Sequence, residues 1–287
     1  MKITNINSPL VSVQWLAENF EAENLVILDA SMKPVGAASN LDSTEEPSCI
    51  KGARRFDFDN DIRDKNTDLP HMMPSAEFFT DEMQKLGIHK DSAIVVYDYA
   101  GLFSSPRAWW MFRVMGHSQV AVLDGGLPAW KKAGFACGVQ AETIAKQRGN
   151  FVAHLQPGLF CDSAQVLEAL SDPRFAVLDA RSEGRFKGVE PEPRAGLRSG
   201  HMPNALNLPF ANTVQNGFML PSTKLDSIFS KLVNKEQKLI FSCGSGVTAC
   251  ITALAAELAG YPNITVYDGS WSEWGLPSSG LPVETIL

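Results

Sequence analysis

The chain carries the same sequence blocks twice, in the same order and about 150 residues apart. Val26-Ile-Leu-Asp-Ala-Ser31 returns as Ala176-Val-Leu-Asp-Ala-Arg181, and Ala93-Ile-Val-Val-Tyr-Asp98 returns as Lys238-Leu-Ile-Phe-Ser-Cys243. Two further pairs keep this order, namely residues 52–58 with 204–210 and residues 122–130 with 266–274. Four blocks in register indicate a tandem duplication, and the period is a domain length rather than that of a solenoid repeat.

We therefore expect two related domains, at residues 8–138 and 159–287, joined by a linker at residues 139–158. Each half alternates short apolar runs, such as residues 175–179, with amphipathic stretches. One such stretch, residues 223–232, predicts a helix whose apolar positions share one face, namely Leu225, Ile228, Phe229 and Leu232. The alternation predicts α/β domains, each with a mainly parallel sheet covered by helices on both faces.

One cysteine follows directly on a predicted strand of the second half, where parallel sheets bind their ligands. Cys243 is followed by a glycine-rich loop and then by a predicted helix at residues 249–259; the loop continues as Gly244, Ser245, Gly246, Val247 and Thr248. Its two glycines permit backbone angles closed to other residues, so that loop amides can converge on one point. These amides and the helix amino end favour a thiolate, and we interpret Cys243 as a nucleophile at the rim of the sheet rather than an inert cysteine.

The first half has Asp98 and Tyr99 at the corresponding place and offers no thiol there. We therefore predict that the first half contributes scaffold rather than a second nucleophile. A cysteine phosphatase loop needs an arginine six positions after its cysteine to bind the phosphoryl oxygens. Ala249 occupies that position here, which argues against phosphatase chemistry.

Charge and cysteine usage exclude several other classes of function. The formal net charge of −7 argues against nucleic-acid partners, which need a basic face. The five cysteines are scattered without CxxC spacing, which favours reduced thiols in the cytoplasm over disulfides or a metal site. Residues 1–9 have no signal-peptide core, and no run of about 20 apolar residues predicts a membrane span.

Beyond these patterns, the chain resembles the rhodanese-like sulfurtransferases from about Val11 to Val283. The resemblance rests on the paired halves, on the strand–cysteine loop–helix arrangement, and on Tyr267-Asp-Gly-Ser-Trp-Ser-Glu-Trp274. The loop is similar to that of the 3-mercaptopyruvate sulfurtransferases, whereas thiosulfate sulfurtransferases typically carry Arg-Lys in place of Gly244-Ser245. The resemblance therefore implies two rhodanese-like domains, of which the second is catalytic.

The resemblance also implies a substrate-binding pair of arginines. Arg185 and Arg194 match the two that family members use to bind the carboxylate and the keto oxygen of 3-mercaptopyruvate. We expect both in a loop after the strand that ends at Asp179. Arginine binds carboxylates through two parallel hydrogen bonds, which lysine does not reproduce. From the spacing alone, both arginines would be interpreted as solvated surface residues.

Three further residues match a relay proposed for the family. Ser245 matches the loop serine, His71 a histidine brought from the first half, and Asp59 its partner acid. Asp57 and Asp61 are neighbouring alternatives to Asp59, and His71 has the simpler interpretation of a packing residue at the domain boundary.

The implied activity moves sulfur from 3-mercaptopyruvate to a thiol acceptor, such as thioredoxin or a small thiol, or to cyanide. A persulfide on Cys243 carries the sulfur, pyruvate is released, and neither a metal nor an organic cofactor is required. Two alternatives stay open: a thiosulfate:cyanide sulfurtransferase, and a non-catalytic rhodanese-like module that carries sulfur or senses oxidant.

Overall fold

The structure, a computed structural model, describes residues 1–33, 48–138, 145 and 147–286. These residues form two compact units. The first comprises Met1–Asp64, Pro74–Gln156 and Asn216–Phe218, and the second comprises Lys65–Met73, Pro157–Gln215 and Met219–Leu287. The domain boundaries at 8–138 and 159–287 stay predictions, and residues 139–144 and 146 of the predicted linker lie outside the described residues.

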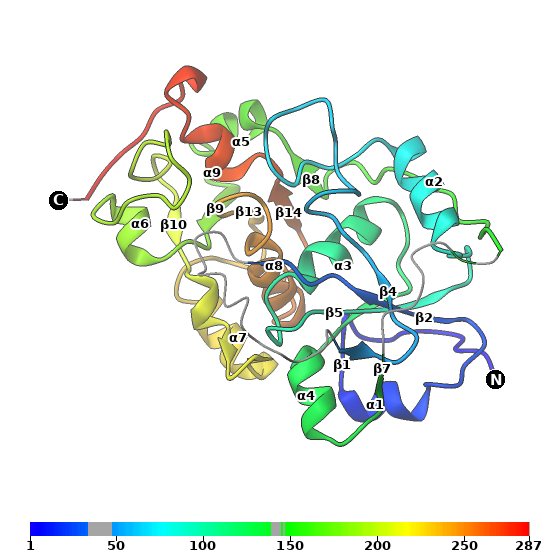
Figure 1. The fold of residues 1–287 in the computed structure, drawn as a ribbon. Coiled ribbons are helices and arrows are strands. Elements are labelled where there is room, and N and C mark those ends of the chain that lie inside the picture. The colour runs from blue at the N-terminus through cyan, green and yellow to red at the C-terminus, as the bar shows by residue number, and fades with distance from the viewer. Residues whose placement is uncertain (34–47, 139–144, 146, 287) are drawn as a thin grey trace. The chain divides into compact units, whose positions relative to one another are not determined.

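Parallel strands form the sheet of the first unit, in the order β1-β6-β5-β2-β4. Figure 1 labels β1, β2, β4 and β5 of this sheet. The elements of the first half are, in chain order, β1 (Leu10–Val11), α1 (Val13–Glu18), β2 (Leu25–Asp29), β3 (Cys49–Ile50), β4 (Arg54–Arg55), α2 (Ala76–Lys85), β5 (Ala93–Tyr97), α3 (Ser105–Val114), β6 (Val120–Leu123), α4 (Gly126–Lys132) and β7 (Cys137–Gly138). Strands β3 and β7 pair antiparallel, apart from this sheet.

The sheet of the second unit repeats this order as β8-β14-β13-β9-β10, again with every pair parallel. The elements of the second half are β8 (Phe160–Cys161), α5 (Ser163–Ala169), β9 (Phe175–Asp179), α6 (Glu183–Lys187), β10 (Leu206–Asn207), η1 (Phe210–Asn212), β11 (Val214–Gln215), β12 (Phe218–Met219), α7 (Ser222–Phe229), β13 (Lys238–Ser242), α8 (Ala249–Leu258), β14 (Ile264–Tyr267), α9 (Ser270–Trp274) and η2 (Pro277–Ser279). Each repeated block holds a strand at the same place in both sheets, so the predicted tandem α/β duplication is confirmed.

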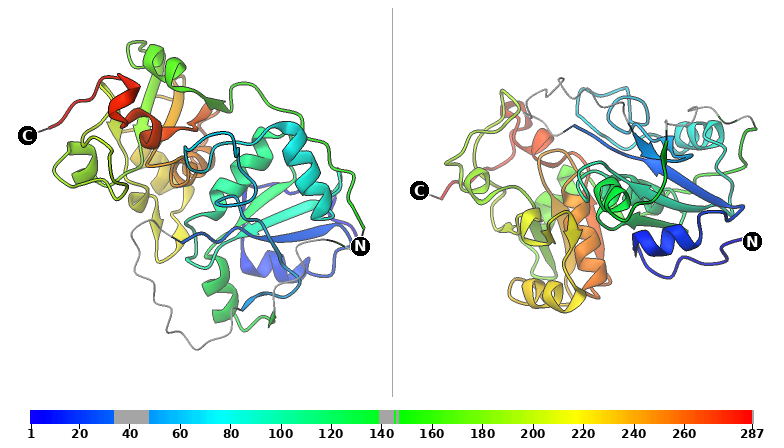
Figure 2. Two further views of the ribbon diagram at one scale, coloured as in Figure 1. Left: turned by 45° about the horizontal axis from the view of Figure 1, so that its top comes forward. Right: turned by 60° about the horizontal axis from the view of Figure 1, so that its bottom comes forward.

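Helices cover both faces of each sheet, as predicted (Figure 2). In the first unit α1 and α4 share a core cluster with one face of the sheet, while α3 packs on β5 and β6. In the second unit α5 and α9 form the equivalent cluster, while α8 packs on β13 and β14. A sheet covered in this way buries both faces of its central strands, and all five residues of β5 are buried.

The helix predicted at residues 223–232 is shorter than expected. It ends at Phe229, and Leu232 lies beyond it with 37% of its surface exposed. The amides of Leu232 and Val233 both donate to the Phe229 carbonyl, so the chain leaves the helix in a tight turn that buries Val233 instead. Periodicity alone could not show this turn. Among the described residues, no helix combines the length and the apolar character that a membrane crossing requires.

Candidate active site

The predicted cysteine loop lies at the carboxyl end of the central strand of the second unit. Strand β13 ends at Ser242 and α8 begins at Ala249, so the six residues 243–248 connect them as expected. Cys243 is only 2% exposed, although its position at the strand end predicted a thiol at the rim. The difference arises because α9 and the loop pack around the cysteine backbone.

A serine of the next strand–helix connection holds Cys243 in place. The Cys243 amide donates to Ser270 Oγ at 3.2 Å, and the same hydroxyl donates to the Tyr267 carbonyl at 2.9 Å. Ser270 has a φ of 49°, close to the 51° of Gly126 at the corresponding place in the first unit. A side chain in this left-handed region is strained, and here the serine hydroxyl makes two hydrogen bonds that glycine cannot make. We had not predicted a role for Ser270, although its replacement of a glycine in the repeat was visible in the sequence.

Helix α9 also binds the carbonyls at the start of the loop. The Trp271 amide donates to the Cys243 carbonyl at 3.0 Å, and the Ser272 amide donates to the Gly244 carbonyl at 2.8 Å. The Ser272 hydroxyl donates to the same Gly244 carbonyl at 2.7 Å. With its carbonyls bound in this way, the loop has a defined backbone before any ligand enters.

The amides of the loop, in contrast, are available to an anion. Within the described residues, no protein acceptor binds the amides of Gly244, Ser245, Val247 and Thr248. Gly246 has a φ of 74°, as predicted for a residue that turns the loop, whereas Gly244 does not adopt a left-handed backbone. Amides of this kind, ahead of a ten-residue helix, can donate hydrogen bonds to an anionic ligand.

Both predicted arginines lie beside the loop. A β-carbon built at Gly244 would lie 3.3 Å from Arg185 Nη2 and 3.7 Å from Arg194 Nη1. Gly244 therefore leaves room for the guanidinium groups, which is a different role from the backbone freedom predicted for it. The prediction that both arginines lie in a loop was wrong for Arg185, which lies on the short helix α6; Ser182 caps this helix by accepting from the Arg185 amide.

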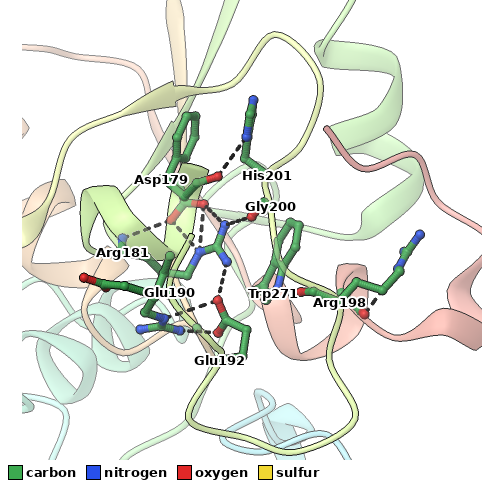
Figure 3. A network of polar contacts seen from close by, with 12 residues as sticks. Asp179, Arg181, Glu190, Glu192, Arg198, Gly200, His201 and Trp271 are labelled. Carbon is green, nitrogen blue, oxygen red and sulfur yellow. Dashed lines mark hydrogen bonds and ion pairs between the residues drawn. The ribbon is translucent and has the colours of Figure 1, made fainter. Parts of the chain in front are cut away.

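A buried network of charges supports Arg185 (Figure 3). Glu192 accepts from Arg185 Nε at 3.2 Å and from Arg181 Nη1 at 2.7 Å, and Arg181 also donates to both oxygens of Asp179. The Arg181 guanidinium stacks on the Trp271 ring at 4.0 Å. Burial opposes the charge of Arg181, but the adjacent Asp179 and Glu192 carboxylates outweigh it and raise the Arg181 pKa. We had not predicted this network, although the repeat places the uncharged Ser31 where the second half has Arg181.

Replacing Arg181 by alanine should lower the free energy of unfolding by about 3–5 kcal/mol, because two buried carboxylates would lose their shared partner. The matched control is Arg174→Ala, since the Arg174 side chain is 82% exposed and water screens its surface pair with Asp172, so its removal should change the stability little. Urea denaturation of both variants measures the difference. Equal losses would show that the buried network adds nothing beyond a surface ion pair.

A segment from the first half of the chain folds into the second unit and reaches the loop. The segment is Lys65–Met73, and it brings His71 Nδ1 to 3.0 Å from Ser245 Oγ. Asp268 anchors its end by accepting from the Met73 amide at 2.7 Å. His71 is 3% exposed and has a φ of 63°, so its ring is held in one place by a strained backbone.

Asp59 belongs to the first unit, where its amide donates to Asp57 Oδ1 at 3.1 Å. Its place in a relay with His71 therefore stays a prediction. Among the residues that the structure describes, no group of three or more His, Cys, Asp or Glu side chains is gathered for a metal ion.

Comparison with known proteins assigns the family. The rhodanese-like domain pattern matches residues 12–133 and 162–276. The 3-mercaptopyruvate sulfurtransferase of Escherichia coli (strain K12) is 38% identical over 278 residues, which cover 96% of this chain and 98% of that protein. The thiosulfate sulfurtransferase of Rattus norvegicus is 42% identical over 274 residues, covering 92% of this chain and 91% of that protein.

A solved structure agrees with these relatives. The crystal structure of SseA from Escherichia coli, described with the rhodanese fold, superposes with a TM-score of 0.79 at 35% sequence identity. The match covers 93% of this chain and 100% of that one. Both halves of the chain match the domain pattern, and the relatives match nearly end to end, so this chain belongs to the two-domain rhodanese-like sulfurtransferase family.

Proposed function

We propose that this protein transfers sulfur from 3-mercaptopyruvate through a persulfide on Cys243. The observation that carries the proposal is the pair of guanidinium groups, Arg185 and Arg194, that face Gly244 next to the cysteine. A donor that places its sulfur at Cys243 then has two cations within reach for a carboxylate and a keto oxygen. A mercapto-keto acid carries a sulfur, a keto oxygen and a carboxylate in one small molecule.

In the first half-reaction, the Cys243 thiolate attacks the sulfur of bound 3-mercaptopyruvate. A sulfur–sulfur bond forms, the carbon–sulfur bond breaks, and its electron pair stays on carbon as the enolate of pyruvate. The arginines stabilise the enolate oxygen, and protonation at carbon gives pyruvate. The outer sulfur then remains on Cys243 as a persulfide, whose negative charge the free loop amides can stabilise.

The second half-reaction restores the enzyme. A thiolate acceptor, such as thioredoxin or a small thiol, or cyanide attacks the outer sulfur and takes it, and the Cys243 thiolate leaves. The pairing of Ser245 with His71 at 3.0 Å supports a role for both in delivering the proton to the enolate. Asp59 is the proposed partner acid of His71.

Thiosulfate is the alternative donor, and the relatives include a thiosulfate sulfurtransferase. It is a dianion and suits a cationic loop, but a side chain at Gly244 would approach the Arg185 guanidinium to 3.3 Å. A cationic residue at that position would therefore repel Arg185. A loop without cationic side chains is compatible with the two arginines beside it. We accordingly propose 3-mercaptopyruvate as the preferred donor.

The donor preference can be tested by steady-state kinetics. We expect kcat/KM for 3-mercaptopyruvate to exceed that for thiosulfate at least tenfold, with cyanide as common acceptor, since each tenfold step needs only about 1.4 kcal/mol of differential binding. A ratio in favour of thiosulfate would move the assignment to the alternative. A single turnover without recycling would instead identify a sulfur carrier or sensor rather than an enzyme.

The proposed compartment is the cytoplasm. All five cysteines are free, including the exposed Cys137. Free thiols on a protein of this size are typical of reducing compartments.

A further inference from the structure

The second unit has a groove of about 600 Å³ at the amino ends of its strands, at the end opposite Cys243. Its floor includes the first residues of three adjacent strands, namely Phe175 of β9, Lys238 of β13 and Ile264 of β14. Helix α5 forms one wall with Gln165 and Glu168. The volume lies within the range of about 300–1,000 Å³ that is usual for binding pockets.

The equivalent place in the first unit is filled by the chain's own amino-terminal segment. Ile3 and Ile6 pack into the core cluster beside α1. The backbone of the segment is held at two points, since the Ile3 amide donates to Asn24 Oδ1 at 2.8 Å and the Ile6 amide donates to Gln119 Oε1 at 2.8 Å. Asn24 also donates back to the Ile3 carbonyl at 2.9 Å.

The spacing of these contacts shows that the segment is extended. Asn24 directly precedes β2 and Gln119 directly precedes β6, with β5 between the two strands. Two strand spacings amount to about 9.6 Å, and three extended residues span about 10 Å. The extended chain from Ile3 to Ile6 therefore runs across the ends of β2, β5 and β6, and it has one isoleucine at each end.

In the second unit, no described segment of the chain occupies the groove in this way. Residues 147–156, which lead toward β8, belong to the first unit and are hydrogen-bonded there: the Phe151 amide donates to the Ile88 carbonyl, and the Gln156 amide donates to the Val114 carbonyl. The next contact is conserved between the units, since the Leu159 carbonyl accepts from Val266 as the Pro9 carbonyl does from Val122. The chain thus enters β8 as it enters β1, but among the residues that the structure describes, none before β8 takes the place of residues 1–7.

Polar side chains lie around the groove at the positions whose counterparts bind the segment in the first unit. Asn263, directly before β14, stands where Gln119 stands, and Arg174, directly before β9, stands where Asn24 stands. Lys238 replaces the alanine at the start of β5. Asp172, which also lines the groove, pairs with Arg174, so the net positive charge at this end comes from Lys238. In the first unit, Lys2 of the segment pairs with Asp91.

We infer that this groove binds an extended segment of a partner protein that has two branched apolar residues three positions apart and an acidic residue before the first. The apolar pair follows from the way Ile3 and Ile6 fill the twin site, and the acidic residue follows from the charge of Lys238. A second copy of this chain is a poorer occupant, because its Lys2 would meet the like charge of Lys238. The inference does not depend on the sulfur donor.

The test uses a nonapeptide that copies residues 1–9 with Lys2→Asp, acetylated at its amino end and labelled with fluorescein at its carboxyl end. We expect saturable binding to the full-length protein by fluorescence anisotropy. Ile3→Asp with Ile6→Asp in the peptide should abolish binding, and Asn263→Ala in the protein should weaken it. Lys238→Glu should weaken binding of the Lys2→Asp peptide about fivefold, as expected for one exposed charge pair. The same variant should bind the peptide that keeps Lys2, because the two charges then attract each other.

The matched control is Lys224→Glu, an exposed charge reversal on α7 away from the groove. Its affinity for the peptide and the sulfurtransferase activity of all the protein variants should match the wild type. Absence of saturable binding, or equal affinities of the Lys238→Glu and Lys224→Glu proteins, would overturn the inference. Dimerisation of the unlabelled protein that Asn263→Ala weakens and Lys238→Glu strengthens, measured by sedimentation velocity, would assign the groove to residues 1–9 of a second copy and would overturn it as well.

Discussion

Replacement of Cys243 by serine is expected to lower kcat/KM for 3-mercaptopyruvate by about 10⁴-fold or more, the scale of loss when an enzyme nucleophile is removed. The serine hydroxyl fits the same space but cannot form a persulfide. Binding by Arg185 and Arg194 is unaffected, so the variant should still bind the donor without turnover. Steady-state pyruvate release and an equilibrium titration with 3-mercaptopyruvate measure the two effects separately.

Mass spectrometry adds a direct test of the intermediate. Wild-type protein treated with 3-mercaptopyruvate in the absence of acceptor should gain the mass of one sulfur atom on the peptide that contains Cys243. Cys161→Ser is the matched control, because burial raises the pKa of the Cys161 thiol to about 12 and keeps it neutral at working pH. A sulfur adduct on another cysteine, or full activity of Cys243→Ser, would contradict the assigned nucleophile.

Replacement of Arg185 by alanine is expected to lower kcat/KM for 3-mercaptopyruvate by about 100-fold, since two charge-assisted hydrogen bonds together contribute about 3 kcal/mol. The fold should survive, because Glu192 keeps Arg181 as its partner at 2.7 Å. Arg185→Lys keeps the charge but lacks the planar fork, and it should recover only part of the loss.

The arginine prediction has its own control in Arg174→Ala, a surface arginine at the opposite end of β9. That variant should retain wild-type kcat/KM. Thiosulfate kinetics on the same proteins test selectivity, because a dianion without a keto group should depend less on the Arg185 fork. A loss of equal size for both donors, or no loss for Arg185→Ala, would remove Arg185 from the proposed binding role.

Much of the fold could be predicted because it is written in local patterns. The strands β9 and β13 are short, continuous apolar runs, which is the signature of strands buried on both faces. The loop after Cys243 contains residues that bring amides together. Errors arose where tertiary contacts decide the end of an element, as at Leu232, which the pattern included in α7 although the chain turns away after Phe229.

The site was predictable only in part. Cys243 could be found from its own neighbours in sequence, whereas Arg185 and Arg194 needed a family resemblance, because an arginine in a polar stretch is usually a surface residue. The roles of Glu192 and Ser270 could not be predicted from their neighbours in sequence. Each acts through one specific side-chain contact, with Arg185 and with the Cys243 amide respectively.

The sequence by itself determined the duplication, the parallel sheets and the position of the thiol, because repeats, apolar runs and a glycine-rich loop are features of neighbouring residues. The tertiary structure decided what surrounds the thiol: Lys65–Met73 joins the second unit and brings His71 to Ser245, and Glu192 holds Arg185 beside Gly244. It also decided that one of two equivalent grooves is filled by residues 1–7, whereas no described segment fills the other. Contacts of this kind join distant segments, and they exist only once burial of the two cores has fixed the path of the chain.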